Sequence, residues 1–210
     1  MRFIGDTETK PLVLDNLIPL VYQNELEQSV FELPFYLTKS IGYDSTLPNA
    51  EIGGINFLDN IGFSHALILN NDIMSDKWVL FKPILYFFSQ QTNIFVKDIL
   101  RVRLRLTLQN PETNNYLFNK PHTDLPDHAG SYKTLVYYIN DSDGDFYLFD
   151  KYYNPYEHTE EALKDIDKKI ILQKTPKKGT AIYFDGHQYH AGNTPLKHQY
   201  RYVINFDFTI

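Results

Sequence analysis

Two side chains able to bind a metal stand two positions apart in PHTDLPD, residues 121–127. On an extended backbone, residues i and i+2 project from the same face, so His122 and Asp124 could hold one metal ion together. The alternative is a turn in which Pro121 and Pro126 fix the backbone and Asp124 accepts local hydrogen bonds. A His-x-Asp pair taken alone favours the turn, because so short a motif often arises by chance.

A third candidate ligand lies in GTAIYFDGHQYHAGNTP, residues 179–195, which offers His187 and His190 at the end of a predicted strand. Two imidazoles and one carboxylate on one face of Fe(II) form the ligand set of non-haem oxygenases, which leaves other coordination positions open for substrates. The residue types therefore indicate iron chemistry. They leave open which of the two histidines takes part.

Arg201 follows His190 by eleven residues and opens the predicted strand RYVINFDFTI. With HAGNTPLKHQY as the turn, antiparallel pairing would bring His190 and Arg201 to the same end of neighbouring strands. An arginine fork there could hold a dicarboxylate through two parallel hydrogen bonds. The alternative is an arginine in a salt bridge at a sheet edge.

The elements that must position these residues change in character near residue 95. Before it, apolar residues three and four apart predict helices in 15–33 and 75–92, the second with Ser75 or Asp76 as its cap and a bend at Pro83. After residue 98 alternation dominates. The strand ILRVRLRLTL, residues 99–108, has one apolar face and one arginine face, which we expect to be solvated. The alternative is that these arginines bind an anion or line a pocket mouth.

Five further short strands are predicted, with turn-rich segments between them and a single helix at 159–169 that Thr159 could cap. This spacing favours an antiparallel sandwich or barrel. The predicted strands are 133–140, 145–150, 169–175, 180–185 and 201–210.

The composition limits the class of protein. The chain has 210 residues, of which 43% are hydrophobic, so one substantial core is expected. A net charge of −6 argues against nucleic acid as a partner, which is bound through clustered Lys and Arg. Without cysteine, any metal must be held by His and carboxylates. We find no signal sequence or membrane span and expect a soluble, cytoplasmic protein, while the oligomeric state stays open.

The ordered set of HTD at 122–124, YYIN, DSDGDFYLFD, PKKGTAIYF, HAGNTP and Arg201 resembles the 2-oxoglutarate- and Fe(II)-dependent dioxygenases of the prolyl-hydroxylase-like branch, and above all their small phage and bacterial members. The match covers roughly residues 98–208. It implies a mainly β (α+β) fold, a double-stranded β-helix of the jelly-roll or cupin-like kind. We expect a single domain, 1–210, in which 98–210 form this core and 1–97 a helical support region.

The resemblance implies roles for five residues. His122, Asp124 and His190 would be the iron ligands; His190 is preferred to His187 because the family's second histidine precedes a small residue and glycine. Arg201 would bind the distal carboxylate of 2-oxoglutarate. Tyr138 would contact the same carboxylate, which agrees with alternation along its strand.

The implied reaction uses O2 to convert 2-oxoglutarate into succinate and CO2 while a C–H bond of a peptide, amino acid or small metabolite is hydroxylated. Ascorbate is a candidate accessory reductant. Prolyl hydroxylases usually carry a second glycine in the turn after YYIN, where this chain reads Gly144-Asp145-Phe146, so peptidyl proline is an open question as substrate.

Two other kinds of protein remain as alternatives. A non-redox cupin-like isomerase or binding protein would close the metal site with a fourth protein ligand, and we see no glutamate well placed for this. A scaffold module would keep the ligands without using them. A second pair, His158 and Glu160, is better explained by a helix start, and DSDGD by a strand turn.

Overall fold

The computed structural model describes residues 10–38, 51–52, 55–56, 61–111 and 117–210. Its strands pair antiparallel throughout the described residues and form two main sheets. The larger sheet has the order β1 (Leu12–Leu14), β11 (Ala181–Asp185), β8 (Lys133–Tyr138), β13 (Tyr200–Phe208), β7 (Ile99–Leu108), β5 (Gly62–Leu69) and β2 (Tyr36–Thr38), with β6 (Asp72–Ile73) paired to β5.

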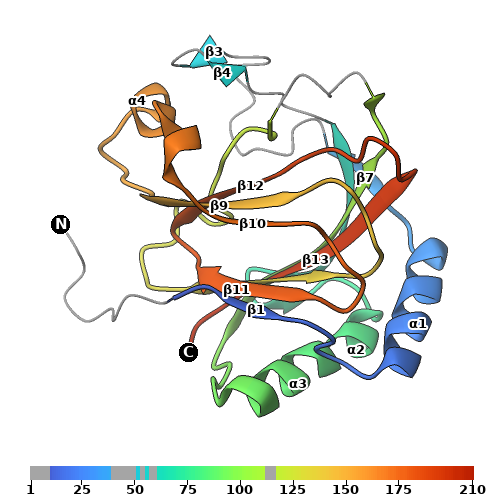
Figure 1. The fold of residues 1–210 in the computed structure, drawn as a ribbon. Helices are drawn as coiled ribbons and strands as arrows, with labels where there is room; N and C mark the ends of the chain where they lie inside the picture. Colours follow the sequence, from blue (N-terminus) through green and yellow to red (C-terminus); the bar gives the residue numbers. More distant parts are fainter. Residues whose placement is uncertain (1–9, 39–50, 53–54, 57–60, 112–116) are drawn as a thin grey trace.

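The smaller sheet has the order β10 (Ile170–Lys174), β9 (Phe146–Tyr152) and β12 (Gln188–Gly192), and β3 (Glu51–Ile52) pairs with β4 (Ile55–Asn56). Figure 1 shows the two main sheets stacked face to face. Along the chain, β8, β11 and β13 join the larger sheet, while β9, β10 and β12 join the smaller one. Strands that alternate between two facing antiparallel sheets make a jelly roll, which confirms the predicted mainly β fold.

The helices of the N-terminal region cover the outside of the larger sheet (Figure 1). Pro83 divides the second predicted helix, as expected, because proline lacks the N–H that would continue the first segment. Neither Ser75 nor Asp76 is the cap, since the helix begins after Lys77. These helices are α1 (Leu20–Ser29), the 3₁₀ helix η1 (Val30–Glu32), α2 (Trp78–Phe81) and α3 (Pro83–Thr92).

The third predicted helix is shorter than expected. It forms α4 (Thr159–Leu163) and a separate 3₁₀ turn, η3 (Ile166–Lys169), because Asp165 adopts a left-handed conformation with φ 56° between them. Thr159 does not cap it: the cap position is His158, without a side-chain hydrogen bond. Both elements pack on the outer face of the smaller sheet, where Leu163 and Ile166 join the apolar cluster around Phe149.

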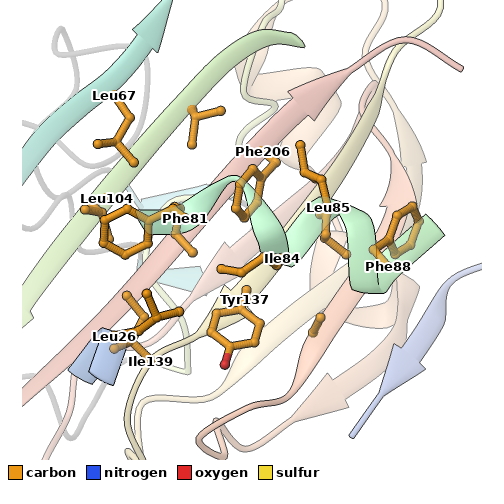
Figure 2. Close-up of a cluster of buried hydrophobic side chains, with 14 of the residues drawn as sticks. Leu26, Leu67, Phe81, Ile84, Leu85, Phe88, Leu104, Tyr137, Ile139 and Phe206 are labelled. Atoms are coloured by element: carbon orange, nitrogen blue, oxygen red, sulfur yellow. The ribbon is translucent and has the colours of Figure 1, made fainter. Parts of the chain in front are cut away.

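One face of the larger sheet is an apolar core. Val102 and Leu104 of β7 and Phe206 of β13 are fully buried against the helices. Figure 2 shows this cluster, with Phe81 and Ile84 projecting from the helices toward the sheet. The burial of this face explains the apolar half of the alternation in β7.

The arginine face of β7 is not solvated, contrary to our expectation. Arg101 is only 8% exposed, and Arg105 lines a cavity together with residues of the smaller sheet. This face points into the space between the two sheets. Both faces of β7 are therefore covered, and one covered face carries charge because it borders the cavity. Within the described residues, no helix has the length and hydropathy needed to cross a membrane.

Candidate metal centre

Two short antiparallel backbone hydrogen bonds hold His122 and His190 together. The amide of His122 donates to the carbonyl of His190 at 2.9 Å, and the amide of His190 donates back at 3.0 Å. This bridge joins the loop after β7 to β12 and sets the two imidazole centroids 4.7 Å apart. Asp124 is near enough that one ligand atom from each of the three residues lies within 4.8 Å of the others.

The two imidazoles are oriented in the same way. Nδ1 of His122 lies 3.2 Å from the carbonyl oxygen of Lys120, and Nδ1 of His190 lies 3.3 Å from that of Gln188. Because a carbonyl oxygen only accepts, each ring carries its proton on Nδ1. The Nε2 lone pairs are then free to bind a metal, and the backbone fixes their direction.

Arg101 and Asn205 hold the Asp124 carboxylate in place. Arg101 forms an ion pair with Oδ1 and also donates to the backbone carbonyl of Asp124 at 2.8 Å, while the amide of Asn205 donates to Oδ2 at 3.1 Å. Burial alone would raise the pKa of Asp124, but the charge of Arg101 holds that pKa well below its usual range. Asp124 is thus a buried anion in a fixed orientation.

Two observations on the imidazoles fit a bound cation. Nε2 of His190 is buried without a hydrogen-bond partner in the described structure, and its nearest carboxylate oxygen, Oδ2 of Asp124, is 3.6 Å away. Burial, and then the neighbouring His190, lower the pKa of His122 to about 3, so its imidazole is neutral at physiological pH. Neutral imidazole and ionised carboxylate are the forms that coordinate metals.

Arg101 also connects the candidate metal centre to strand β13 of the larger sheet. Its Nε donates to Asp207 at 2.8 Å, and the hydroxyl of Thr134 donates to the other oxygen of that carboxylate at 2.8 Å. Burial raises the pKa of Asp207 to about 6. Arg101 therefore forms ion pairs with both carboxylates, and through it strand β13 helps to hold the candidate ligand Asp124 in position.

Arg201 lies in the same cavity as the two histidines. Its Nη1 donates to the carbonyls of Gly144 and Asn193, both at 2.6 Å, and its Nη2 lies 3.5 Å from the hydroxyl of Thr107. Nε is buried without a partner among the described residues. The Nε–Nη2 edge is thus the side of the guanidinium left for a ligand, and two parallel donors match a carboxylate.

Two glycines make room for this arginine. A Cβ on Gly192 would stand 2.9 Å from Nη2 of Arg201, and one on Gly144 would stand 3.0 Å from Nη1 and 2.5 Å from the carbonyl oxygen of Asn193. Neither position tolerates a side chain without displacing the guanidinium or the backbone. The glycine that follows the candidate ligand His190 by two residues is therefore part of the Arg201 site.

Tyr138 lines the cavity and is 2% exposed. It lies directly across from Val203 in the pairing of β8 with β13. Burial raises the pKa of Tyr138, against the opposing influence of Arg201, so the hydroxyl stays neutral. The structure thus brings the five predicted residues to one region: three form the candidate metal group, and Arg201 and Tyr138 line the cavity beside it.

The other histidines have separate roles. Nε2 of His187 lies 3.0 Å from the carbonyl of Gly130, outside the three-residue group. His65 contacts the carbonyl of Pro34 and the hydroxyl of Ser75. In the DSDGD turn, the Asp143 carboxylate accepts from the amides of residues 197 and 198, which fastens one turn to another.

Sequence reasoning missed Asn205 behind the carboxylate. It gave Arg101, also behind the carboxylate, and Arg105, in the cavity wall, a place at the site only as the alternative to a solvated face. The signal for the arginines is the regular alternation of 99–108, which fits a solvated face equally well. For Asn205 the strand pattern of 201–210 offers only an isolated polar residue.

The sequence matches no family model and no curated protein. Solved structures do match. A 2OG-Fe(II) oxygenase family oxidoreductase from Burkholderia pseudomallei aligns with a TM-score of 0.62 at 11% identity over 95% of this chain and 84% of that one. A prolyl-4-hydroxylase from Pseudomonas putida gives 0.53 at 11% over 95% and 92%. The epimerase SnoN from nogalamycin biosynthesis, in complex with Fe3+, alpha ketoglutarate and nogalamycin RO, gives 0.53 at 9% over 95% and 78%.

These likenesses span nearly the whole chain at very low identity, so they concern the fold. They agree with the facing antiparallel sheets seen here. The chain therefore has the double-stranded β-helix fold of the 2-oxoglutarate- and Fe(II)-dependent oxygenases, a fold that it shares with a prolyl hydroxylase.

Proposed function

We propose that this protein is an Fe(II)- and 2-oxoglutarate-dependent oxygenase that hydroxylates a C–H bond of a small-molecule or peptide substrate. The observation that carries the proposal is the convergence of His122, Asp124 and His190, two of which line a cavity that also holds the open edge of Arg201. The fold and the site point to the same class of chemistry by independent routes.

Fe(II) fits the three ligands by their chemistry. Two imidazoles and one carboxylate on adjacent backbone segments form the facial set that this metal takes in oxygenases. With 2-oxoglutarate and O2, the bound iron would supply the oxidising chemistry that releases succinate and CO2. Ascorbate would act only as an accessory reductant.

The protein's own residues would bind and orient the cosubstrate. The Nε–Nη2 edge of Arg201 would hold the distal carboxylate of 2-oxoglutarate, with the neutral Tyr138 hydroxyl as a further donor. Phe146 and Val203 line the same cavity and keep water away from these contacts, which strengthens them. Anchoring one carboxylate there would direct the other end of the molecule toward the histidines.

Among the described residues, three side chains form the candidate metal-binding group. Three protein ligands favour an open metal site over the closed site of a non-redox cupin-like isomerase. The presence of Asp124 favours hydroxylation over halogenation, for which a halide would need the place of the carboxylate. Epimerisation, the activity named for one protein of the same fold, is the second candidate reaction, because that protein is described in complex with Fe3+ and alpha ketoglutarate.

The test is visible absorption of the anaerobic protein during titration with Fe(II) and then 2-oxoglutarate. We expect a weak charge-transfer band that needs both, and we expect Asp124→Ala to abolish the band and the release of succinate. Arg201→Gln should form the band with a Kd for 2-oxoglutarate raised about 10- to 100-fold, the value of a lost charge-assisted pair.

Metal binding without the band would indicate a closed, non-redox site. Succinate production at the normal rate by Asp124→Ala would contradict the ligand assignment. Lys97→Gln is a matched surface control, because it removes one positive charge at an exposed position of the same chain.

A further inference from the structure

The cavity wall contains a second arginine to which the proposed chemistry gives no role. Arg105 of β7 lines the same cavity as His122, His190 and Arg201. Its Nη1 is buried and has no hydrogen-bond partner in the described structure. Arg105 also forms no ion pair with any residue of the described ranges.

The nearby carboxylates are already engaged. Asp124 and Asp207 both pair with Arg101, four residues earlier on the same strand face. In the sheet, Arg105 lies across from Ser64 of β5 on one side and Val203 of β13 on the other, neither of which carries charge. Arg105 is therefore a cation in the cavity wall that has no counter-ion among the described residues.

The local charge count favours an anion. Four arginines of this sheet face, Arg101, Arg103, Arg105 and Arg201, meet two carboxylates, Asp207 of the same face and Asp124 of the loop after β7, which leaves 4 − 2 = 2 positive charges among these six groups. Fe(II) would add two positive charges and 2-oxoglutarate would remove two. The excess of two remains after both are bound, and a further anionic group would offset it.

Burial and the neighbouring charge of Arg103 lower the pKa of Arg105 to about 10, so its guanidinium is still charged near neutral pH. Keeping an unpaired charge largely out of water is unfavourable unless a partner offsets the lost hydration. A ligand that carries its own negative charge would provide that partner. Arg201 cannot serve the same ligand, because 2-oxoglutarate would occupy it.

We propose that Arg105 binds an anionic group, a carboxylate or a phosphate, of the primary substrate beside the metal centre. This inference rests on the proposed function, because it assigns Arg201 to the cosubstrate and Arg105 to the molecule that is oxidised. It narrows the substrate class to anionic small molecules or acidic side chains. A neutral proline ring without a nearby carboxylate would leave Arg105 unpaired.

The test is ¹⁵N NMR of the arginine side chains, of which the chain has five, with Zn(II) as a diamagnetic substitute for Fe(II). The signals are assigned through the backbone of each arginine, with Arg105→Lys as a check. Addition of 2-oxoglutarate alone should move the Arg201 signal. If it does not, the cosubstrate assignment fails, whatever the later additions show.

Acetate and methyl phosphate are then titrated separately into the protein loaded with Zn(II) and 2-oxoglutarate, at constant ionic strength. We expect a saturable shift of the Arg105 signal. A shift with acetate alone would indicate that the substrate group is a carboxylate, and a shift with methyl phosphate alone would indicate a phosphate. A shift with both would indicate that Arg105 accepts either oxyanion. An unmoved Arg105 signal would overturn the inference, even if Arg201 had responded to 2-oxoglutarate. A shift confined to the Arg201 signal, caused by the added anion displacing 2-oxoglutarate, would also overturn the inference.

A pair of variants separates a specific contact from general charge. Arg105→Gln should weaken binding of the responsive anion by about tenfold or more, because a buried charged partner is lost. Arg103→Gln makes the same charge change two residues away, outside the lining of the cavity, and should weaken binding much less. Equal losses in the two variants would indicate general charge and overturn the specific role of Arg105. The signal of the unmutated protein decides the main question even if a variant folds poorly.

Discussion

Asn205 and Phe206 are neighbours on β13, yet they project to opposite faces of the larger sheet. Phe206 is fully buried in the apolar core beneath the helices, where its ring lies 6.3 Å from that of Trp78. Asn205 faces the cavity and donates to the carboxylate of Asp124. One face of the strand thus stabilises the fold, and the other positions a candidate ligand.

The same division runs through β7, where Leu104 is buried in the core and Arg105 lines the cavity. Apolar packing is favourable in itself, whereas buried charge is costly unless it is paired. In our interpretation, the charged side chains of this face are tolerated because they bind ligands. Substitutions on the two faces should therefore have separable effects on stability and on ligand affinity.

The largest expected effect is on the outer face. Phe206→Ala should lower the free energy of unfolding by about 3–5 kcal/mol, because it removes a fully buried aromatic ring and leaves a cavity. Denaturant titration measures this change. The folded fraction should bind Fe(II) with nearly unchanged affinity, and a parallel loss of metal affinity would argue against the separation of the two faces.

On the inner face, Asn205→Ala should lower metal affinity by about 10- to 100-fold, because the Asp124 carboxylate loses a donor that orients it. The free energy of unfolding should fall by only about 1 kcal/mol, the value of one hydrogen bond. Metal titration and denaturant unfolding of the same preparation give both quantities. A large loss of stability with unchanged metal affinity would reverse the roles of the two neighbours.

A smaller effect is expected from Gly192→Ala, which places a methyl group 2.9 Å from Nη2 of Arg201. The displaced guanidinium should raise the Kd of 2-oxoglutarate by about tenfold, equivalent to about 1.4 kcal/mol, without changing Fe(II) affinity. The charge-transfer band reports both values. Gly130→Ala is the control, since its Cβ would approach only the side chain of His128; equal effects in the two variants would exclude the steric explanation.

The smallest effect near neutral pH is expected at His122, because its influence on the stability of the metal-free protein develops only below pH 6.5. Folding lowers the pKa of His122 from its ordinary value of 6.5 to about 3, so the folded state favours the neutral ring. The stability contributed by this group is complete above pH 6.5 and is lost as the pH falls toward 3. Unfolding curves for the unmutated protein and His122→Gln should diverge across this window, with the variant less sensitive to acid. Parallel curves would show that His122 titrates normally.

Several features were predictable from the sequence because they depend on local rules. Pro83 had to break a helix, and alternation had to place Asn205 and Phe206 on opposite faces. The order of His122, Asp124, His190 and Arg201 along the chain carries the resemblance to the 2-oxoglutarate- and Fe(II)-dependent dioxygenases, and that resemblance implies a metal and carboxylate site. The effect of Pro83 and the alternation at Asn205 and Phe206 depend on neighbouring residues only, so they do not depend on how the elements pack.

Only the tertiary structure decided that the arginine face of β7 borders a cavity between the two sheets and is not an open surface. A period of two separates the arginines from the leucines, but it does not distinguish solvent from a polar cavity, because both accept charged side chains. The closure of two sheets over that face brought Arg101 to Asp124, joined His122 to His190 through the backbone, and left Arg105 in the cavity wall. Such contacts join residues far apart in the chain, so the site's geometry follows from the packing of the sheets.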